Sequence, residues 1–325
     1  MRTVQLGRSG LAVSPVCIGG NSWGAAGRRD WGAFDEAASR PFFRKALDCG
    51  INFFDTADTY NAGESERILG RVLLDYAPRD EVVICTKMGI PMGKGPNRGG
   101  NSRKYLMAAI DASLSRLGTD HVDLLLIHRT DGVTPIAEML QALDDMVRAG
   151  KVRYVGGSTM PAYRFAQMIG CAEANGWARP VAMQNLYNLV QREEEREMNR
   201  LCAEAGVGLV PYSPLARGFL AANRAREGGG ETERARTDRM AQGLFRPCDF
   251  AVADAVADLA RARGVKPTQI ALAWMLHKPA MAAPVIGTTR LEHIEDAAAA
   301  VDLRLSEAEI AALEAPYEPR ALPLG

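Results

Sequence analysis

The chain has 325 residues, 47% of them hydrophobic, a length that suits an α/β barrel and a composition that can bury a sizeable core. Its 39 lysines and arginines balance its 39 aspartates and glutamates, so the formal net charge is zero. This balance argues against a nucleic-acid-binding protein, and it gives no general attraction to membranes or acidic polymers.

The cysteines and the N-terminal segment indicate the compartment. Six scattered cysteines without a C-x-x-C pair are typical of reduced thiols rather than of a disulfide framework. The first residues contain no apolar stretch of signal-peptide length, and no run approaches the roughly 18 apolar residues of a membrane span. We therefore expect a cytoplasmic protein that binds neither nucleic acid nor membrane. No feature of the sequence predicts the oligomeric state.

Short apolar runs alternate with amphipathic segments over almost the whole length. Residues 2–13, with Gly7-Arg8-Ser9-Gly10 between two short runs, predict a hairpin that caps a barrel floor. Near-continuous apolar runs suit strands that are buried on both faces, as in a parallel sheet. The eight predicted strands are residues 16–18, 51–54, 82–86, 122–127, 152–155, 181–183, 207–210 and 284–286.

The intervening segments have helical periodicity. Apolar residues recur at helix spacing over 68–73, 106–117 and 136–147, and helices are also predicted over 250–263 and 268–277. Eight strand–helix units predict a single (β/α)8 TIM barrel domain over residues 1–325. The main competitor is a doubly wound open sheet, but the first strand is not followed by G-x-G-x-x-G. Residues 217–249 predict a long loop after strand seven, either a lid or binding loop or a disordered segment.

Polar side chains follow three neighbouring predicted strands. Strands two, three and four end in Asp55, Lys87 and His128, and Tyr60 comes shortly after Asp55. Active sites of (β/α)8 barrels are built where strands end, so these four residues should converge. Taken singly, a buried Asp–Lys pair is more often structural, and a lone histidine is more often a satisfied polar residue. Their convergence favours a functional site.

This set of residues suits the reduction of a carbonyl, which needs a hydride on carbon and a proton on oxygen. A cofactor supplies the hydride. Tyr60 can give the proton, and the Lys87 ammonium would lower the tyrosine pKa from its usual value near 10. Asp55 would keep Lys87 charged and aimed, and a neutral His128 would hydrogen-bond the carbonyl oxygen.

The sequence resembles the aldo-keto reductase family over about residues 3 to 314. GINFFDTADTY at residues 50–60 is similar to the family signature that carries the catalytic aspartate and tyrosine. The segments around Lys87, His128 and Ser158 match later motifs, and 184–185, 211–215 and 284–287 fill the remaining positions in order. The resemblance implies that Asp55, Tyr60, Lys87 and His128 are the catalytic residues.

The resemblance also implies a nicotinamide cofactor, NADPH (NADP+), extended across the barrel mouth without a Rossmann fold. Ser158 and Gln184 would hydrogen-bond the carboxamide, and Tyr212 would stack on the nicotinamide ring. The residues along the pyrophosphate would be Ser213, Leu215 and Arg217. Those around the adenosine 2′-phosphate would be Thr288, Thr289, Arg290 and His293. Gly287 is a further expected cofactor-binding residue, and the loop 217–249 would fold over the cofactor.

The chain departs from the family pattern at three places. Thr159 follows the fifth-strand serine, where asparagine is common, and Ala216 stands where glycine is frequent. Near the C-terminus, Asp296-Ala297 replaces a Glu-Asn pair that contacts adenine, and His293 stands where an arginine is often seen beside the 2′-phosphate. Arg290 still supplies a fixed charge, so NADPH is preferred over NADH.

Other chemistries lack their motifs. The sequence has no zinc-ligand spacing and no phosphate-binding P-loop, so no metal is expected. Trp23, Trp31 and Met88 follow strands one and three, and they either wall a substrate pocket or pack in the core. The substrate is a small carbonyl compound that the sequence does not specify further. Two alternatives remain open: a non-catalytic NADPH-binding sensor or subunit resembling potassium-channel β subunits, and an alcohol dehydrogenase working in the oxidative direction.

Overall fold

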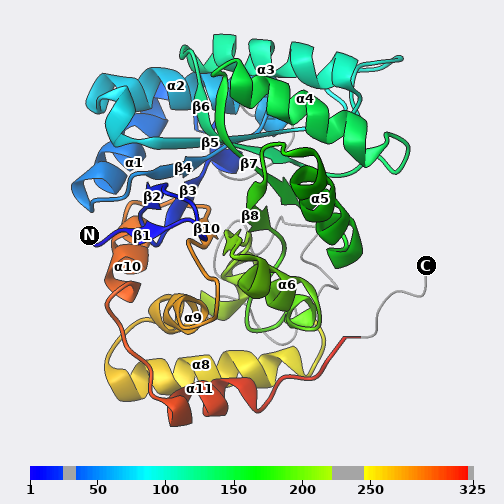
Figure 1. The fold of residues 1–325 in the computed structure, drawn as a ribbon. Coiled ribbons are helices and arrows are strands. Elements are labelled where there is room, and N and C mark those ends of the chain that lie inside the picture. The colour runs from blue at the N-terminus through cyan, green and yellow to red at the C-terminus, as the bar shows by residue number, and fades with distance from the viewer. Residues whose placement is uncertain (25–33, 222–244, 321–325) are drawn as a thin grey trace.

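A parallel sheet of eight strands forms the centre of the protein (Figure 1). The computed structural model describes residues 1–24, 34–221 and 245–320. Each of the eight predicted strands is present, within a few residues of its predicted bounds. In spatial order they are β10 (Val285–Ile286), β3 (Cys17–Gly19), β4 (Phe53–Asp55), β5 (Val83–Met88), β6 (Val122–Ile127), β7 (Val152–Ser158), β8 (Pro180–Gln184) and β9 (Gly208–Leu209).

The two ends of this sheet meet and close it into a barrel. Just beyond β9, Tyr212 pairs in parallel with Val285 of β10, and Leu209 pairs with Met281. The N–H of Val285 donates to the carbonyl of Pro211 at 2.9 Å. The predicted (β/α)8 fold is therefore confirmed.

Helices cover the outside of the barrel (Figure 1). All five predicted helices are present, as α2, α3, α4, α8 and α9. No helix in the described part of the chain is both long and apolar enough to cross a membrane. The α-helices are α1 (Glu36–Asp48), α2 (Glu64–Tyr76), α3 (Arg103–Leu117), α4 (Ile136–Arg148), α5 (Ala162–Asn175), α6 (Met198–Ala205), α8 (Asp249–Arg263), α9 (Pro267–Leu276), α10 (Glu292–Ala300) and α11 (Glu307–Glu314). Short 3-10 helices are η1 (Gly20–Ser22), η2 (Tyr60–Gly63), η3 (Arg79–Glu81), η4 (Glu193–Glu195) and η5 (Ala216–Ala221).

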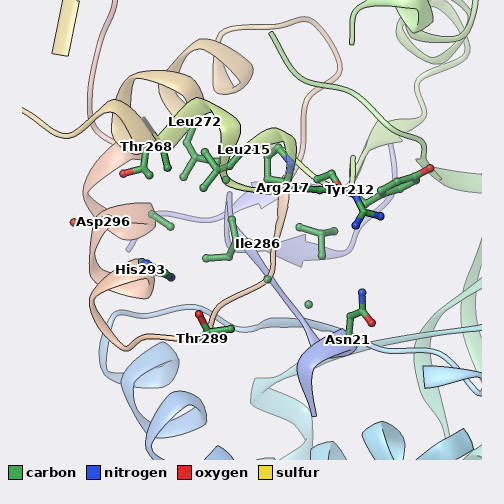
Figure 2. Close-up of a pocket in the computed structure, with 18 of the residues that line it drawn as sticks. Asn21, Tyr212, Leu215, Arg217, Thr268, Leu272, Ile286, Thr289, His293 and Asp296 are labelled. Carbon is green, nitrogen blue, oxygen red and sulfur yellow. The ribbon is translucent and has the colours of Figure 1, made fainter. Parts of the chain in front are cut away.

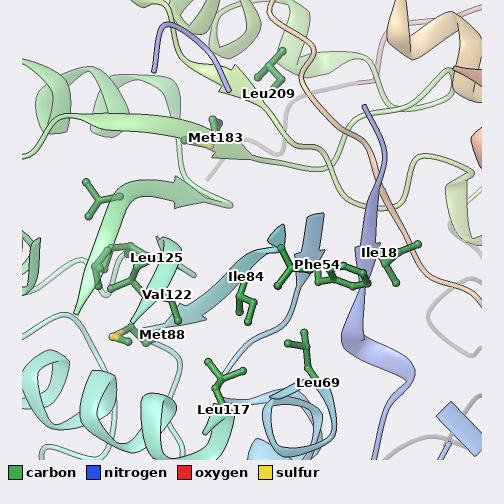
Figure 3. Close-up of a cluster of buried hydrophobic side chains, with 14 of the residues drawn as sticks. Ile18, Phe54, Leu69, Ile84, Met88, Leu117, Val122, Leu125, Met183 and Leu209 are labelled. Atoms are coloured by element: carbon green, nitrogen blue, oxygen red, sulfur yellow. The ribbon is translucent and has the colours of Figure 1, made fainter. Parts of the chain in front are cut away.

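Apolar side chains fill the space between the strands and the helices. Figure 3 shows Phe54 and Ile84 of the sheet beside Leu69 of α2 and Leu117 of α3, and all four are buried. Because side chains alternate along a strand, the intervening residues point into the barrel. Near its amino-terminal end the barrel is therefore also packed with apolar side chains.

The N-terminal hairpin closes the floor of the barrel, as predicted. β1 (Val4–Gln5) and β2 (Ala12–Val13) pair antiparallel, and Leu6 packs with the side chains of the barrel interior. The N–H of Arg8 donates to the carbonyl of Gly206 at 2.8 Å, which ties the turn to the barrel. With the floor covered, the opposite end, where the strands terminate, is left for a site.

Candidate active site

Four polar side chains meet at the carboxyl ends of β4, β5 and β6. Asp55 is the last residue of β4, Lys87 lies near the end of β5, His128 follows β6 and Tyr60 begins η2. The Lys87 Nζ lies 2.6 Å from Asp55 Oδ2 and 3.3 Å from Tyr60 Oη, and it donates to the carbonyl of Thr56 at 2.9 Å. Lys87 is 0% exposed and Asp55 2%, so the ammonium has exchanged water for these three oxygens. The structure thus brings the four predicted residues together.

The turn that carries Tyr60 is held in a constrained conformation. After β4 the backbone still follows β5, because the N–H of Asp58 donates to the carbonyl of Lys87 at 3.0 Å. Asn61 and Ala62 then adopt positive φ angles of 49° and 55°, which non-glycine residues rarely do. The Asn61 Nδ2 donates to the carbonyl of Trp23 at 2.5 Å and fixes the turn against the loop after β3. Such strained backbone is concentrated at functional sites in proteins.

Burial and the charge of the neighbouring side chain shift the pKa in opposite directions, both for Lys87 and for Tyr60. Burial is the largest single influence on the pKa of Lys87 and lowers it, but Asp55, Tyr60 and Cys85 together raise it more, so the net pKa is above the ordinary value. Burial raises the pKa of Tyr60, and Lys87 only partly opposes this. The expected lowering of the tyrosine pKa is therefore not the net result. Tyr60 is a neutral phenol throughout the physiological range.

The imidazole of His128 is uncharged. Burial, with the nearby Lys87 and Arg129 cations, lowers its pKa to about 3. Its ring meets the Tyr60 ring edge to face, with the ring centroids 5.8 Å apart. A neutral imidazole has one N–H to donate, so His128 and Tyr60 form a pair of hydrogen-bond donors.

A cavity of about 730 Å³ begins at Tyr60 and extends to α10 (Figure 2). Its volume is within the range of about 300–1,000 Å³ typical of ligand sites. Among the residues expected around a cofactor, those that line it are Gln184, Tyr212, Ser213, Leu215, Arg217, Gly287, Thr289, Arg290 and His293. Several further lining residues were not predicted from the sequence, among them Asn21, Phe34, Lys266, Pro267, Thr268 and Leu272.

The two ends of this cavity differ in chemistry. Figure 2 shows the Tyr212 ring at one end and His293 of α10 at the other. Arg290 and Lys266 add two cationic side chains to the α10 end. An aromatic ring at one end and cationic side chains at the other suit an elongated ligand, with a flat ring near Tyr60 and an anionic group near α10. Thr288 is buried and does not line the cavity, and its hydroxyl donates to the carbonyl of Arg290 at 2.6 Å.

A model of the Aldo/keto reductase family matches residues 15–318 of the chain. The chain belongs to this family. It is 40% identical to the versiconal hemiacetal acetate reductase of Aspergillus parasiticus, over 99% of this chain and 98% of that protein. It is also 40% identical to a putative aryl-alcohol dehydrogenase of Schizosaccharomyces pombe, over 97% and 95%, and to an aldo-keto reductase of Alternaria alternata, over 97% and 91%. The chain is thus an oxidoreductase of carbonyl compounds, in a family that generally uses NADH or NADPH.

In this aldo/keto reductase, Gln184 joins the cavity to the buried ion pair. Its Nε2 donates to Asp55 Oδ1 at 3.0 Å, so Asp55 accepts from Lys87 through one oxygen and from Gln184 through the other. Ser158 does not line the cavity, and its hydroxyl donates to the carbonyl of Gln184 at 2.8 Å. Thr159, which stands where asparagine is common, has a φ of 46°. The sequence did not predict the link between Gln184 and Asp55.

Two of the three residues considered for a substrate pocket lie in the hydrophobic core. The Trp23 ring is 1% exposed and packs on Phe43, with the ring centroids 4.2 Å apart. Met88 is fully buried, because Lys87 points into the barrel and the next residue of the strand must face the helices. Both side chains thus pack in the core, and neither lines the described cavity. Trp31 and residues 222–244 of the predicted loop lie outside the described residues.

Proposed function

We propose that this aldo/keto reductase reduces an aldehyde or ketone to an alcohol with NADPH, and that Tyr60 protonates the oxygen. One observation carries the proposal. The Lys87 ammonium, clamped by Asp55 at 2.6 Å, lies 3.3 Å from the Tyr60 hydroxyl in a fully buried position. Tyr60 and Asp55 also line the long cavity, which ends in cationic side chains.

The cavity fits a nicotinamide dinucleotide. Tyr212 would stack on the nicotinamide ring, and Gln184 would meet its carboxamide. At the α10 end, Arg290 and His293 would hold a 2′-phosphate, which favours NADPH, since guanidinium groups match phosphate geometry well. Bound there, the reduced nicotinamide supplies the hydride.

The protonation states of the four side chains explain how the proton would be transferred. Tyr60 holds its proton until the carbonyl oxygen gains electron density, because burial raises its pKa. When the proton leaves, the Lys87 ammonium stabilises the phenolate, and Asp55 keeps the ammonium charged and in place. Neutral His128 donates its N–H to the same oxygen and fixes its direction. A raised tyrosine pKa favours reduction over the reverse reaction, which needs the phenolate.

The relatives suggest which carbonyls to test first. A putative aryl-alcohol dehydrogenase is among them, so aromatic aldehydes are the first candidate substrates. A second relative is a reductase of a hemiacetal ester, so ring-forming hydroxy-aldehydes follow.

The test is the loss of NADPH absorbance with a panel of aldehydes and ketones, run beside NADH. We expect turnover in the wild type, and in Tyr60→Phe a loss of about 100- to 10,000-fold in kcat with NADPH affinity retained. Near-normal turnover in Tyr60→Phe would refute the proton-donor assignment. NADPH binding without turnover on any carbonyl would favour the sensor or subunit alternative, and catalysis only of alcohol oxidation would favour the dehydrogenase.

A further inference from the structure

The α10 end of the cavity contains a titratable ring among fixed charges. His293 lies in the first turn of α10 and lines the cavity with Arg290, Lys266 and Asp296. In Figure 2 it projects from α10 toward the middle of the cavity. Among the described residues, its ring nitrogens have no hydrogen-bond partner. Both nitrogens are therefore available to a ligand.

The charges that surround His293 are largely paired with one another. Lys266, which precedes α9, contacts Asp296 Oδ1 at 2.8 Å. Arg290 contacts Glu292 at 3.4 Å. Two carboxylates and two cations thus act on the ring with opposing signs.

The remaining acid of this turn, Glu295, is held elsewhere. It pairs with Lys45 of α1 at 2.6 Å. With the neighbouring charges nearly balanced, burial is the main influence, and it lowers the pKa of His293 below its ordinary value of 6.5. Without a ligand, the ring is therefore mostly neutral at pH 7.

We propose that His293 makes the selection between NADPH and NADH depend on pH, because it takes up a proton when the 2′-phosphate binds. The proton comes from solvent and adds to the free ring nitrogen, and no other bond changes. The inference rests on the proposed function, since it assumes that the dinucleotide lies in this cavity with its 2′-phosphate at α10. NADH lacks this phosphate, so its binding should leave the imidazole pKa unchanged and the ring neutral.

The pH dependence has a defined sign. A phosphate dianion beside an imidazole raises the imidazole pKa, so NADPH affinity falls as the pH rises through the interval between the free and bound values. Each unit of that interval corresponds to about a tenfold change in affinity. A phosphate monoester has its own pKa near 6, so binding also weakens below about pH 6. Only the decline above pH 6.5 reports on His293.

The test is calorimetric titration of the full chain with NADPH and with NADH, at pH 6.5 to 8.5 and in two buffers of different ionisation enthalpy. For the wild type we expect uptake of a fraction of a proton with NADPH and none with NADH. The NADPH Kd should rise about 3- to 10-fold over this pH range, and the NADH Kd should stay level.

Two variants distinguish proton uptake by His293 from proton uptake by any other group. His293→Arg carries a permanent charge, so it should bind NADPH with no proton uptake and a Kd that is constant above pH 7. His293→Gln should bind NADPH at pH 6.5 as weakly as the wild type does at pH 8.5. Equal proton uptake in wild type and His293→Arg, or none in the wild type, would overturn the inference and leave the reductase function intact. Failure of NADPH to bind at any pH would overturn both.

Discussion

The two ends of the cavity hold their charges in different ways. At the barrel mouth, Lys87 and Asp55 are buried, and their hydrogen bonds of 2.6–3.3 Å go to neighbouring strands and to the Tyr60 turn. At the α10 end, the Arg290 side chain is 61% exposed and its ion pair with Glu292 is 3.4 Å long. The ion pair of the first arrangement is buried, and that of the second is exposed to solvent.

The difference matches what each end has to do. A proton donor needs a fixed geometry and a low dielectric, in which one ammonium acts strongly on one phenol. Recognition of a phosphate needs only favourable charge, because surface pairs exchange easily with a ligand or with salt. We therefore expect substitutions at the barrel mouth to change kcat by orders of magnitude, and substitutions near α10 to change affinity modestly.

The largest effect should come from Lys87→Met, which keeps the side-chain length and removes the charge. The Tyr60 phenolate loses the ammonium that stabilises it, so kcat should fall about 1,000-fold. NADPH affinity should change little, because Lys87 does not line the cavity. Steady-state kinetics and cofactor fluorescence measure the two quantities.

This variant needs a control for folding, since it leaves Asp55 buried without its counter-ion. Removing one partner of a buried pair costs about 3–5 kcal/mol. Lys87→Met with Asp55→Asn should recover most of that stability in a thermal unfolding experiment and remain inactive. Recovery of activity in the double variant would show that Lys87 acts only through the fold.

Asp58 provides the next largest effect, because it is a buried carboxyl that forms no ion pair with any residue that the structure describes. The Tyr105 hydroxyl donates to its Oδ2 at 3.3 Å, and Oδ1 has no partner among the described residues. Burial, with the Glu66 carboxylate, raises its pKa from 3.8 to about 7. The folded state therefore keeps a proton that the unfolded state has lost, and this carboxyl lowers stability progressively as the pH rises from about 4 to 7.

Asp58→Asn cannot ionise, so its advantage in the free energy of unfolding should grow with pH. We expect a difference near zero at pH 4 and on the order of 2–4 kcal/mol at pH 8.5, measured by denaturant unfolding. Tyr105→Phe is the matched control, because it removes the hydroxyl and leaves the carboxyl. An advantage of Asp58→Asn that is the same at both pH values would contradict the assignment.

The barrel mouth was predictable from the sequence because it depends on local rules. Apolar runs predicted the strands, and the polar residues at the ends of three strands, Asp55, Lys87 and His128, predicted the site. The same rule of alternation, applied one residue further, would have placed Met88 among the helices. The link between Gln184 and Asp55 was out of reach, because it joins residues far apart in the chain across the barrel.

The electrostatics were predictable only in part. The sequence shows that Lys87 lies near Tyr60, which predicts a lowered tyrosine pKa. It does not show the degree of burial, which outweighs the ammonium and raises that pKa. The cationic end was also incompletely predicted, because Lys266 reaches it from the start of α9 rather than from the motif that precedes α10.

At the α10 end, Arg290→Ser should weaken NADPH binding about tenfold, equivalent to about 1.4 kcal/mol. The NADH Kd should stay within about twofold, because the lost contact is with the extra phosphate. Added salt should reduce the difference between wild type and variant, since Arg290 is exposed. A similar loss of affinity for both dinucleotides would place the phosphate elsewhere and break the comparison between the two ends.

The smallest effect should come from Thr159→Asn, beside the predicted carboxamide site. Thr159 has a φ of 46°, which a β-branched residue tolerates poorly and asparagine tolerates better. We expect a gain of about 1 kcal/mol in the free energy of unfolding and NADPH binding about two- to fivefold tighter, because the amide adds a hydrogen-bond donor. Thr159→Ser removes the branch without adding an amide, so it should gain part of the stability and none of the affinity. If both variants bind NADPH equally well, the asparagine amide makes no contact, and relief of backbone strain is the whole effect.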